Sequence, residues 1–285
     1  MQASDHIPVS VVVMTRNEER NIERCLRSAE PFAEVFVVDS GSTDRTAAIA
    51  TSFGSNVVQF RWNGQYPKKK QWCLEHLPFA HDWVLYLDAD EVVYPELAAE
   101  IAALVASGPR HAGYFAGYDY VFLGRTLRRG QRVRKLVLFD RRRGRFVDYP
   151  DLDATNMWEV EGHYQPAIDG TVGVLDARIL HADHDSLFHY FERHNRYSDW
   201  EAVVRAKGAL GSAEAQPGSR AALKRAFDRL PLKGLAAFVV SYVLQGGFLE
   251  GKAGFHFAVA RGFYYWQIGV KGKERRLAAH TEAKR

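Results

Sequence analysis

The chain has 285 residues, of which 47% are hydrophobic and 25% are charged. These proportions are typical of globular proteins, and they exclude a wholly disordered chain, a collagen-like chain and a multi-span membrane protein. Lys and Arg number 38 against 34 Asp and Glu, and the resulting net charge of +4 does not by itself indicate nucleic-acid binding. We expect one large domain, or a core domain with appendages, and no nucleic-acid partner.

The N-terminal third of the chain favours a reducing compartment. Cys25 and Cys73 are the two cysteines of the sequence, and they form no CxxC pair. Residues 1–7 lack the basic segment and apolar stretch of a secretory signal, and the apolar run at 9–14 is too short to span a bilayer. We therefore expect a cytoplasmic protein.

Four short apolar runs rich in β-branched residues begin near residues 9, 34, 57 and 83, with segments of helical character between them. This spacing suits a strand followed by its crossover helix, so the first hundred residues predict βαβ units around a parallel sheet. In such a fold helices cover both faces of the sheet, and each parallel strand ends at a loop on the same edge.

After Gly108 the pattern changes to shorter alternating runs. Residues 113–122, 135–139 and 171–180 predict antiparallel or mixed strands, and 186–207 predict a polar and aromatic helix. The Gly, Ser, Ala and Pro content beyond that helix indicates a linker. The expected organisation is a domain over residues 1–207, a linker over 208–219 and a helical extension over 220–285.

The last segment differs in composition from the rest. Residues 234–249 carry no charge, and residues 253–270 carry six aromatic residues with His256 and Arg261 as their basic members. Both runs fall short of the ~20 apolar residues that a spanning helix requires. An amphipathic helical hairpin lying on an anionic membrane surface fits this composition, and a pair of buried helices is the alternative. We favour membrane contact because of the basic residues around both runs, namely Arg220, Lys224, Arg225, Arg229, Lys233, Lys252, Lys271, Lys273, Arg275 and Arg276.

The fourth apolar run ends in Asp88-Ala89-Asp90-Glu91. A strand of a parallel sheet presents such residues at its carboxyl end, where open α/β folds bind ligands. Three carboxylates within four positions repel one another unless a cation lies among them. Oxygen ligands suit Mg²⁺ or Mn²⁺, which commonly keeps phosphate oxygens as further ligands. The loop therefore predicts a divalent metal and a diphosphate, and the alternative is a solvated acidic loop before a helix that begins at Pro95.

The ends of the first two runs carry further polar residues. The first ends in Thr15-Arg16-Asn17-Glu18 and lacks the GxGxxG pattern, which disfavours a dinucleotide-dependent dehydrogenase. The second ends in Asp39-Ser40-Gly41. Asp39 can accept hydrogen bonds from a base or a ribose, although a capped helix entry gives the same pattern.

These motifs together resemble those of family-2 glycosyltransferases with the GT-A fold. TRNE, DSGSTDRT, a Lys-Gln pair before a helix, and LDADE occur in that family's order and spacing. The later segments resemble the bacterial subgroup of lipopolysaccharide inner-core beta-glucosyltransferases, namely residues 120–125, 138–142, 158–159, 180–181 and 247–252. The resemblance implies an α/β GT-A (Rossmann-like) mixed sheet with flanking helices, a catalytic domain over 1–207 and a C-terminal amphipathic helical extension.

The resemblance also implies roles for individual residues around a UDP-sugar donor. Asp90 and His181 are the implied ligands of a divalent metal, Mn²⁺ or Mg²⁺. The implied nucleotide contacts are Thr15, Arg16 and Glu18, with Asp39 toward the base, Lys70 toward base or phosphate, and Asp88 toward the ribose.

Attack by an acceptor hydroxyl requires a carboxylate base, and a positioned base contributes roughly 10²–10⁴-fold in rate. Glu159 is the first candidate and Glu161, two residues on, is the second. The sequence departs here from the subgroup, which often has His-Glu where Trp158-Glu159 stands. Either residue could instead be a surface carboxylate near Gly162. His181, His184, His189 and His194 match no compact zinc pattern, and a hydrogen-bonded core histidine is the alternative for His181.

Ten basic residues lie between residues 125 and 145. Such a run can bind a phosphorylated acceptor or the donor phosphates, and a solvated basic loop is the alternative. No RNA-binding module with paired stacking aromatics is recognisable.

The sequence therefore predicts an inverting, metal-dependent glycosyltransferase with a lipopolysaccharide-core or other lipid-linked saccharide acceptor. Its expected location is the inner face of the cytoplasmic membrane, as a peripheral protein. The alternatives are a polyprenyl-phosphate glycosyltransferase and a non-catalytic nucleotide-sugar-binding protein at the membrane. Nothing in the sequence sets the oligomeric state.

Overall fold

The computed structural model describes residues 6–148, 151–152, 159–161, 165–183, 186–207 and 232–282. The chain divides into two compact units. Unit 1 comprises residues 1–121, 133–147 and 159–184, and unit 2 comprises residues 122–132, 148–158 and 185–285. The helix predicted at 186–207 thus belongs to unit 2, whereas the sequence analysis placed it in the first domain. The predicted linker at 208–219 lies outside the described residues.

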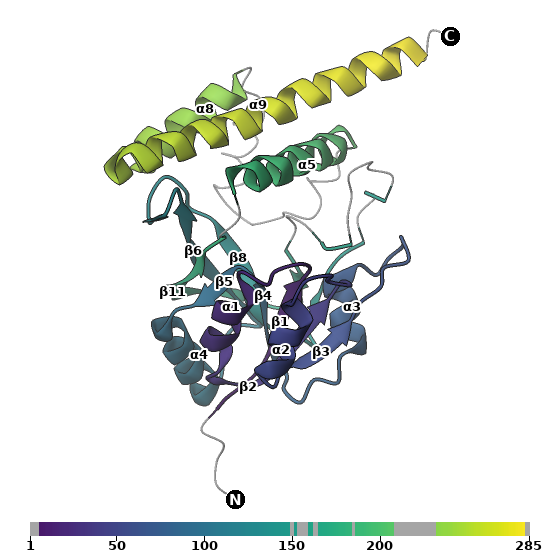
Figure 1. The fold of residues 1–285 in the computed structure, drawn as a ribbon, viewed down its shortest axis with the longest axis vertical. Coiled ribbons are helices and arrows are strands. Elements are labelled where there is room, and N and C mark those ends of the chain that lie inside the picture. The colour runs from purple at the N-terminus through teal and green to yellow at the C-terminus, as the bar shows by residue number, and fades with distance from the viewer. Residues whose placement is uncertain are drawn as a thin grey trace, which may run out of the picture. The chain divides into compact units, whose positions relative to one another are not determined.

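A nine-stranded mixed sheet forms the centre of the fold (Figure 1). Its strand order is β3-β2-β1-β4-β8-β6-β11-β5, and β7 pairs with β6 beside this path. A separate small sheet pairs β9 with β10. The strands are β1 (Ile7–Thr15), β2 (Phe32–Asp39), β3 (Asn56–Gln59), β4 (Trp83–Asp88), β5 (Glu91–Val93), β6 (Gly113–Phe122), β7 (Arg125–Leu127), β8 (Arg134–Asp140), β9 (Gly144–Arg145), β10 (Ala167–Ile168) and β11 (Val172–His181).

The first four strands form a parallel half-sheet, as their spacing in the sequence predicts. β1 lies between β2 and β4 and is parallel to both. The register places Thr15 opposite Asp39 and Met14 opposite Asp88. The loops after β1, β2 and β4 therefore leave the sheet side by side at one edge.

The second half of the sheet is mixed, as the runs after Gly108 predict. β8 runs antiparallel to β4 and β6, β11 runs parallel to β6, and β5 runs antiparallel to β11. His181, the last residue of β11, pairs with Glu91 at the start of β5. This pairing brings the end of β11 to the loop that follows β4. The predicted fold class, a mixed sheet with flanking helices and a long C-terminal helix, is confirmed.

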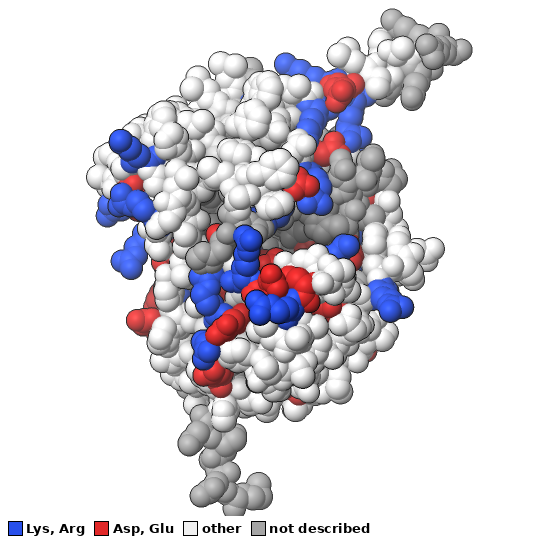
Figure 2. Space-filling view, viewed as in Figure 1, with Lys and Arg blue, Asp and Glu red and all other residues white. Residues whose placement is uncertain are grey.

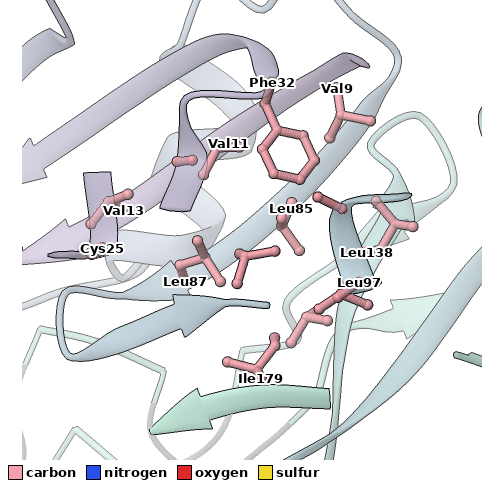
Figure 3. Close-up of a cluster of buried hydrophobic side chains, with 14 of the residues drawn as sticks. Val9, Val11, Val13, Cys25, Phe32, Leu85, Leu87, Leu97, Leu138 and Ile179 are labelled. Carbon is pink, nitrogen blue, oxygen red and sulfur yellow. The ribbon is translucent and has the colours of Figure 1, made fainter. Parts of the chain in front are cut away.

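Successive side chains of β1 point to opposite faces of the sheet, so β1 contributes to the core on both faces. Val9, Val11 and Val13 pack in one cluster with residues of α1 and α4, and Val12 and Met14 pack in a second cluster with residues of α3. Figure 3 shows how side chains from several strands and helices meet in the first cluster. The helices of unit 1 are α1 (Ile22–Ala29), α2 (Thr46–Ser52), α3 (Lys69–His76) and α4 (Pro95–Ser107).

Unit 2 is mainly helical. Its helix α9 packs against both α5 and α8. No single helix of the described residues is long and apolar enough to cross a membrane, and Lys233–Leu244 with Gly247–Ala278 meet the length and composition criteria only as a pair bent by 70°. The elements are α5 (Leu187–Ala206), α8 (Lys233–Val239), the π-helical turn η1 (Val240–Leu244), the 3-10 turn η2 (Gly247–Glu250) and α9 (Gly251–Glu282).

Replacement of a core side chain tests this packing. Leu85 lies in β4 with no exposed surface, so Leu85→Ala should lower the free energy of unfolding by about 2–5 kcal/mol. Val172 is 43% exposed at the start of β11, so Val172→Ala should change it by less than about 0.5 kcal/mol. Urea denaturation measures both values, and equal effects of the two substitutions would contradict the described core.

Candidate active site

The ends of β1 and β2 are joined by a hydrogen-bonded corner. The Asp39 carboxylate is buried and accepts hydrogen bonds from the backbone N–H of Ser42 (2.9 Å), from Nε2 of Gln59 (3.0 Å) and from the Ser42 hydroxyl. The Ser40 N–H donates to the carbonyl of Thr15 (3.1 Å). Gly41 has a φ of 70°, a left-handed conformation that glycine adopts at little cost. These bonds fix Asp39 at the carboxyl edge of the sheet.

The loop after β1 is tied to the loop after β2. The Asn17 N–H donates to Ser42 Oγ (2.8 Å), and the Glu18 N–H donates to Thr46 Oγ1 (2.8 Å). The Glu18 carboxylate accepts a hydrogen bond from Asn21 Nδ2 (2.8 Å), so it also holds the residue before α1.

The two predicted contacts at the end of β1, Thr15 and Arg16, differ in exposure. Thr15 Oγ1 is buried without a hydrogen-bond partner among the described residues, and the Arg16 side chain is exposed. Because a buried hydroxyl without a partner is costly, Thr15 Oγ1 indicates a place where a bound group would supply one.

Lys69 is a buried cation that the sequence analysis did not single out. Its Nζ donates hydrogen bonds to the carbonyl of Thr15 (3.0 Å) and to Ser40 Oγ (2.7 Å), and only 1% of the residue is exposed. Burial lowers the pKa of Lys69 from 10.5 to about 8, although Glu159 and other acidic groups oppose this shift. Lys69 therefore links the ends of β1 and β2 beneath the loops.

Lys70, the predicted contact to base or phosphate, lies at the start of α3 and is partly exposed. Its ammonium group lies 5.8 Å from the ring centroid of Phe146, and its carbonyl accepts a hydrogen bond from the Tyr86 hydroxyl (3.0 Å). The run of three lysines at 68–70 gave no indication of which of them are buried, since that depends on where α3 begins; in the structure Lys68 and Lys69 are buried.

The two candidate bases differ in their surroundings. Glu161 is 1% exposed, and its carboxylate accepts hydrogen bonds from the backbone N–H groups of Lys70 (2.6 Å) and Gln71 (2.9 Å). It thus caps the first turn of α3 from a distant part of the chain. Burial raises its pKa, although these N–H groups oppose the shift. Glu159 is partly exposed, and its carbonyl accepts a hydrogen bond from the Lys69 N–H (2.7 Å).

The acidic loop, residues 88–91, contains its own cation. Lys135 at the start of β8 places its Nζ 2.7 Å from Glu91 Oε1 and 3.1 Å from Asp88 Oδ2. Glu91 is buried, and its Oε2 also accepts hydrogen bonds from the Asp88 N–H (3.1 Å) and the Tyr118 hydroxyl (3.4 Å). The Lys135 ammonium lies 4.8 Å from the Tyr118 ring centroid. One ammonium group thus compensates two of the three carboxylates.

The third carboxylate of the acidic loop faces a histidine. Asp90 Oδ1 lies 3.3 Å from His181 Nδ1 at the end of β11. Both atoms are buried, and neither has a well-aligned hydrogen-bond partner among the described residues. The loop is also held by a backbone contact, because the Asp90 carbonyl accepts a hydrogen bond from the Ala182 N–H (2.8 Å). The predicted metal ligands therefore lie together.

Charge pairing sets the pKa values of this cluster. Burial alone would raise the pKa of Asp88, but the Lys135 ammonium outweighs it and the pKa is lowered. Burial likewise opposes ionisation of Asp90, and the attraction of His181 lowers its pKa. Burial raises the pKa of Glu91, which Lys135 only partly offsets. Burial disfavours the cationic forms of Lys135 and His181, yet the neighbouring carboxylates raise both pKa values.

The Asp90 and His181 pair fits a divalent cation. The Asp90 carboxylate oxygen is a ligand of the kind that Mg²⁺ and Mn²⁺ prefer, and a neutral imidazole such as that of His181 is a common metal ligand. In the part of the chain that the structure describes, no group of three or more His, Cys, Asp or Glu side chains is arranged to hold a metal. Two protein ligands leave the remaining coordination positions for water and phosphate oxygens.

The basic run at 125–145 is divided between the two units. Residues 125–132 belong to unit 2, and the remainder belongs to unit 1. Within unit 1, Lys135 faces the acidic loop, whereas Arg142 at the opposite end of β8 pairs with Asp140 (2.7 Å) and Asp82 (2.8 Å). Lys135 was missed because it was grouped with its basic neighbours. Its position at the start of an apolar strand was the available indication that it lies at the end of the sheet, near the acidic loop.

Comparison with known proteins identifies the family. Residues 10–165, more than half of the chain, match the model of Glycosyl transferase family 2. The chain therefore belongs to this family, as its motifs predict, and it is a family-2 glycosyltransferase.

Particular relatives are similar over parts of their length. An uncharacterized glycosyltransferase of Rickettsia bellii is 41% identical over 100 residues, which are 35% of this chain and 33% of the relative. The lipopolysaccharide core biosynthesis glycosyltransferase LpsC of Rhizobium meliloti is 33% identical over 152 residues, which are 49% of this chain and 53% of LpsC. The chain thus matches a third to a half of these relatives.

Solved structures show a weaker overall likeness. Glucosyl-3-phosphoglycerate synthase from Mycobacterium tuberculosis, crystallised with Mn²⁺, UDP and glucosyl-3-phosphoglycerate, is 27% identical with a TM-score of 0.32. The similarity covers 39% of this chain and 43% of that chain.

The buried Lys69 predicts a specific pH dependence of stability. Its folded-state pKa of about 8 lies below the unfolded value of 10.5, so the unfolded chain binds more protons between these values. Stability relative to Lys69→Met should therefore rise from about pH 8 to about pH 10.5, by at most about 3 kcal/mol. Urea denaturation of both proteins across this range measures the difference. A constant difference would show that Lys69 keeps an ordinary pKa.

Proposed function

We propose that this protein transfers a sugar from a UDP-sugar to a hydroxyl group of a lipopolysaccharide-core or other lipid-linked saccharide. The proposed reaction is an inverting displacement that requires a divalent metal. The observation that carries this proposal is the buried pair of Asp90 Oδ1 and His181 Nδ1, 3.3 Å apart, at the edge where β1, β2 and β4 end. Family membership supports sugar transfer, and the similarity to LpsC supports the class of acceptor.

Asp90 and His181 would hold the metal, Mn²⁺ or Mg²⁺. When bound, such an ion supplies positive charge that stabilises the diphosphate as the sugar–phosphate bond breaks. Lys135 has a separate role in this proposal. By pairing with Asp88 and Glu91 it compensates two of the three carboxylates of the loop and so reduces their mutual repulsion.

The nucleotide would lie along the ends of β1 and β2. The Asp39 carboxylate already holds three donors at the β2 end, and an ionised carboxylate has about four acceptor sites, so one site is left for the base. Thr15 Oγ1 and Arg16 would contact the nucleotide, and Glu18 would order their loop. Lys70 would approach base or phosphate from α3. Asp88, whose side chain is 39% exposed, would accept a hydrogen bond from the ribose.

Glu159 is the proposed base. Inversion by a single displacement requires a carboxylate that removes the proton from the attacking hydroxyl group. Both oxygens of Glu161 accept hydrogen bonds from backbone N–H groups of α3, which favours Glu159 for this role. Glu161 would then act as a positioning residue that fixes the start of α3 beside Glu159. We place the reaction at the inner face of the cytoplasmic membrane, where a nucleotide donor and a lipid-linked acceptor meet.

The metal proposal predicts the behaviour of Asp90→Asn. Wild-type protein should be stabilised against thermal unfolding by UDP and Mn²⁺ together more than by either alone, because each strengthens binding of the other. Asp90→Asn should lose this synergy and at least about 100-fold of the transfer rate, with its melting temperature without ligand unchanged within a few degrees.

Asp176→Asn provides the matched control for this substitution. Asp176 is an exposed carboxylate on β11, the strand that also carries His181, and its replacement should leave both the synergy and the rate unchanged. Full activity of Asp90→Asn in the presence of a chelator would overturn the metal proposal.

The base proposal predicts that Glu159→Gln lowers kcat by about 10²–10⁴-fold with little change in donor binding. UDP release with a lipopolysaccharide-core saccharide as acceptor measures the rate. Wild-type turnover by this variant with the saccharide would show that Glu159 is not the base. Transfer to a polyprenyl phosphate that this substitution leaves unchanged would instead support the alternative acceptor, since a phosphate needs no base. If no nucleotide sugar is transferred or hydrolysed by the wild-type protein, with or without Mn²⁺, the chain is a binding protein.

A further inference from the structure

Helix α9 exposes a row of large apolar side chains. Phe255, Val259, Phe263, Trp266 and Val270 are each between 42% and 54% exposed. At 3.6 residues per turn these five positions fall within an arc of about 80°, and they extend over about 22 Å of the helix. Exposed apolar patches of this extent on a folded protein mark an interaction surface.

A second apolar row lies on the preceding segment. Close packing joins the two segments, since a Cβ built on Gly234 would lie 2.8 Å from the carbonyl oxygen of Gly262. The ring of Phe255 also meets that of Tyr242 with centroids 5.6 Å apart. We call both rows together the hairpin face. Its members on the preceding segment are Leu232, Leu235, Val239, Val243, Leu244, Phe248 and Leu249, and its members on α9 are Phe255, Val259, Phe263, Trp266 and Val270.

Three polar side chains of α9 are turned toward α5 instead. The Tyr264 hydroxyl donates to Glu201 Oε2 (2.7 Å), and Arg275 pairs with Asp199 (2.9 Å). Lys271 Nζ donates to the Asn195 carbonyl (2.6 Å). The contact between α5 and α9 thus includes polar contacts, while the row of five large apolar side chains stays exposed. Exposure of such a row is favourable where the outer medium is itself apolar.

Cations without acidic partners border the hairpin face. Lys252 and Lys273 stand at the two ends of the α9 row, within the same arc of the helix. Two arginines lie at the turn between η1 and α9, because a Cβ on Gly246 would be 3.4 Å from Arg129 Cδ and one on Gly251 would be 3.5 Å from an Arg125 guanidinium nitrogen. All four cations are exposed, and over the described ranges none of them forms an ion pair. In Figure 2 the area over α8 and the N-terminal half of α9 is almost free of charged atoms, with blue side chains at its edges.

An apolar face bordered by unpaired cations favours one binding partner over the others that could cover it. A second copy of the chain docked on the same face would bring the same unpaired cations together, which is unfavourable. An anionic bilayer offers acyl chains to the apolar rows and negative headgroups to the cations around them.

We propose that the hairpin face is a docking surface for an anionic lipid bilayer, with α9 lying along the headgroup region. The proposal adds to the proposed function the surface through which the protein would reach a lipid-linked acceptor. Lipid binding requires neither donor nor acceptor, so it can be tested with the full chain independently of catalysis.

Co-sedimentation with lipid vesicles tests the binding. The full-length protein should bind phosphatidylglycerol–phosphatidylcholine vesicles and bind pure phosphatidylcholine at least about tenfold more weakly, with affinity falling as salt is raised. Phe263→Ser with Trp266→Ser should lower the partition coefficient by more than about tenfold. Val172→Ser with Val174→Ser is the matched control, since these apolar side chains are 43% and 48% exposed in unit 1, and it should bind as the wild type does.

Charge substitutions test the basic border separately. Arg129→Gln and Lys273→Gln should each weaken binding to anionic vesicles about fivefold, whereas Arg110→Gln, an exposed cation of unit 1, should have no effect. Trp266 gives a direct readout of contact, because lipids brominated on their acyl chains should quench its fluorescence. The conservative Trp266→Phe variant should lose that part of the quenching.

Several results would overturn the proposal. Vesicle binding that is equal in the wild type and the Phe263→Ser, Trp266→Ser variant would show that another surface contacts lipid. Quenching that persists unchanged in Trp266→Phe would show the same. Absence of vesicle binding, with a dimer in light scattering that the double variant abolishes, would assign the hairpin face to a second copy of the chain.

Discussion

The charge balance of the acidic loop is the constraint on which the rest of the site depends. Three carboxylates occupy four consecutive positions, and one ammonium group, that of Lys135, compensates Asp88 and Glu91. The strand that carries Lys135 must therefore run antiparallel beside β4, as β8 does. Asp90 is left without this compensation, and it faces His181 from the end of β11. The mixed half of the sheet thus serves the site directly, because it brings both Lys135 and His181 to the edge where the parallel strands end.

Most of the fold could be predicted from the sequence, because its determinants are local. The spacing of apolar runs and their alternation predict β1 to β4 and the later strands β6, β8 and β11. The predictions for Asp90 and His181 follow from motif and position, and their side chains do lie together. The inward position of Lys69 and the capping of α3 by Glu161 could not be predicted, since both depend on contacts between residues far apart in the chain. The assignment of residues 122–132 to unit 2 likewise results from tertiary packing.

Helix α9 exposes a row of large apolar side chains in addition to those that it buries, such as Phe257 and Ile268. Polar residues of α9 contact α5, whereas the exposed apolar row lies beside exposed cations. In water such a face costs free energy, so its presence indicates a surface that covers it. Composition alone favoured membrane contact, but it did not distinguish the cations that bind to α5 from those that remain unpaired. Lys271 and Arg275 belong to the first group, and Lys252 and Lys273 belong to the second.

The central claim is that Asp90 and His181 hold a divalent cation that binds the donor diphosphate. A crystal structure of the protein with UDP and Mn²⁺, recorded at a wavelength near the manganese absorption edge, tests it most directly. The account predicts an anomalous peak in contact with the Asp90 carboxylate, the His181 ring and the UDP phosphates, while Lys135 remains paired with Asp88 and Glu91. An anomalous peak elsewhere would contradict it. Bound UDP without any peak, with Asp90 still paired directly with His181, would contradict it too.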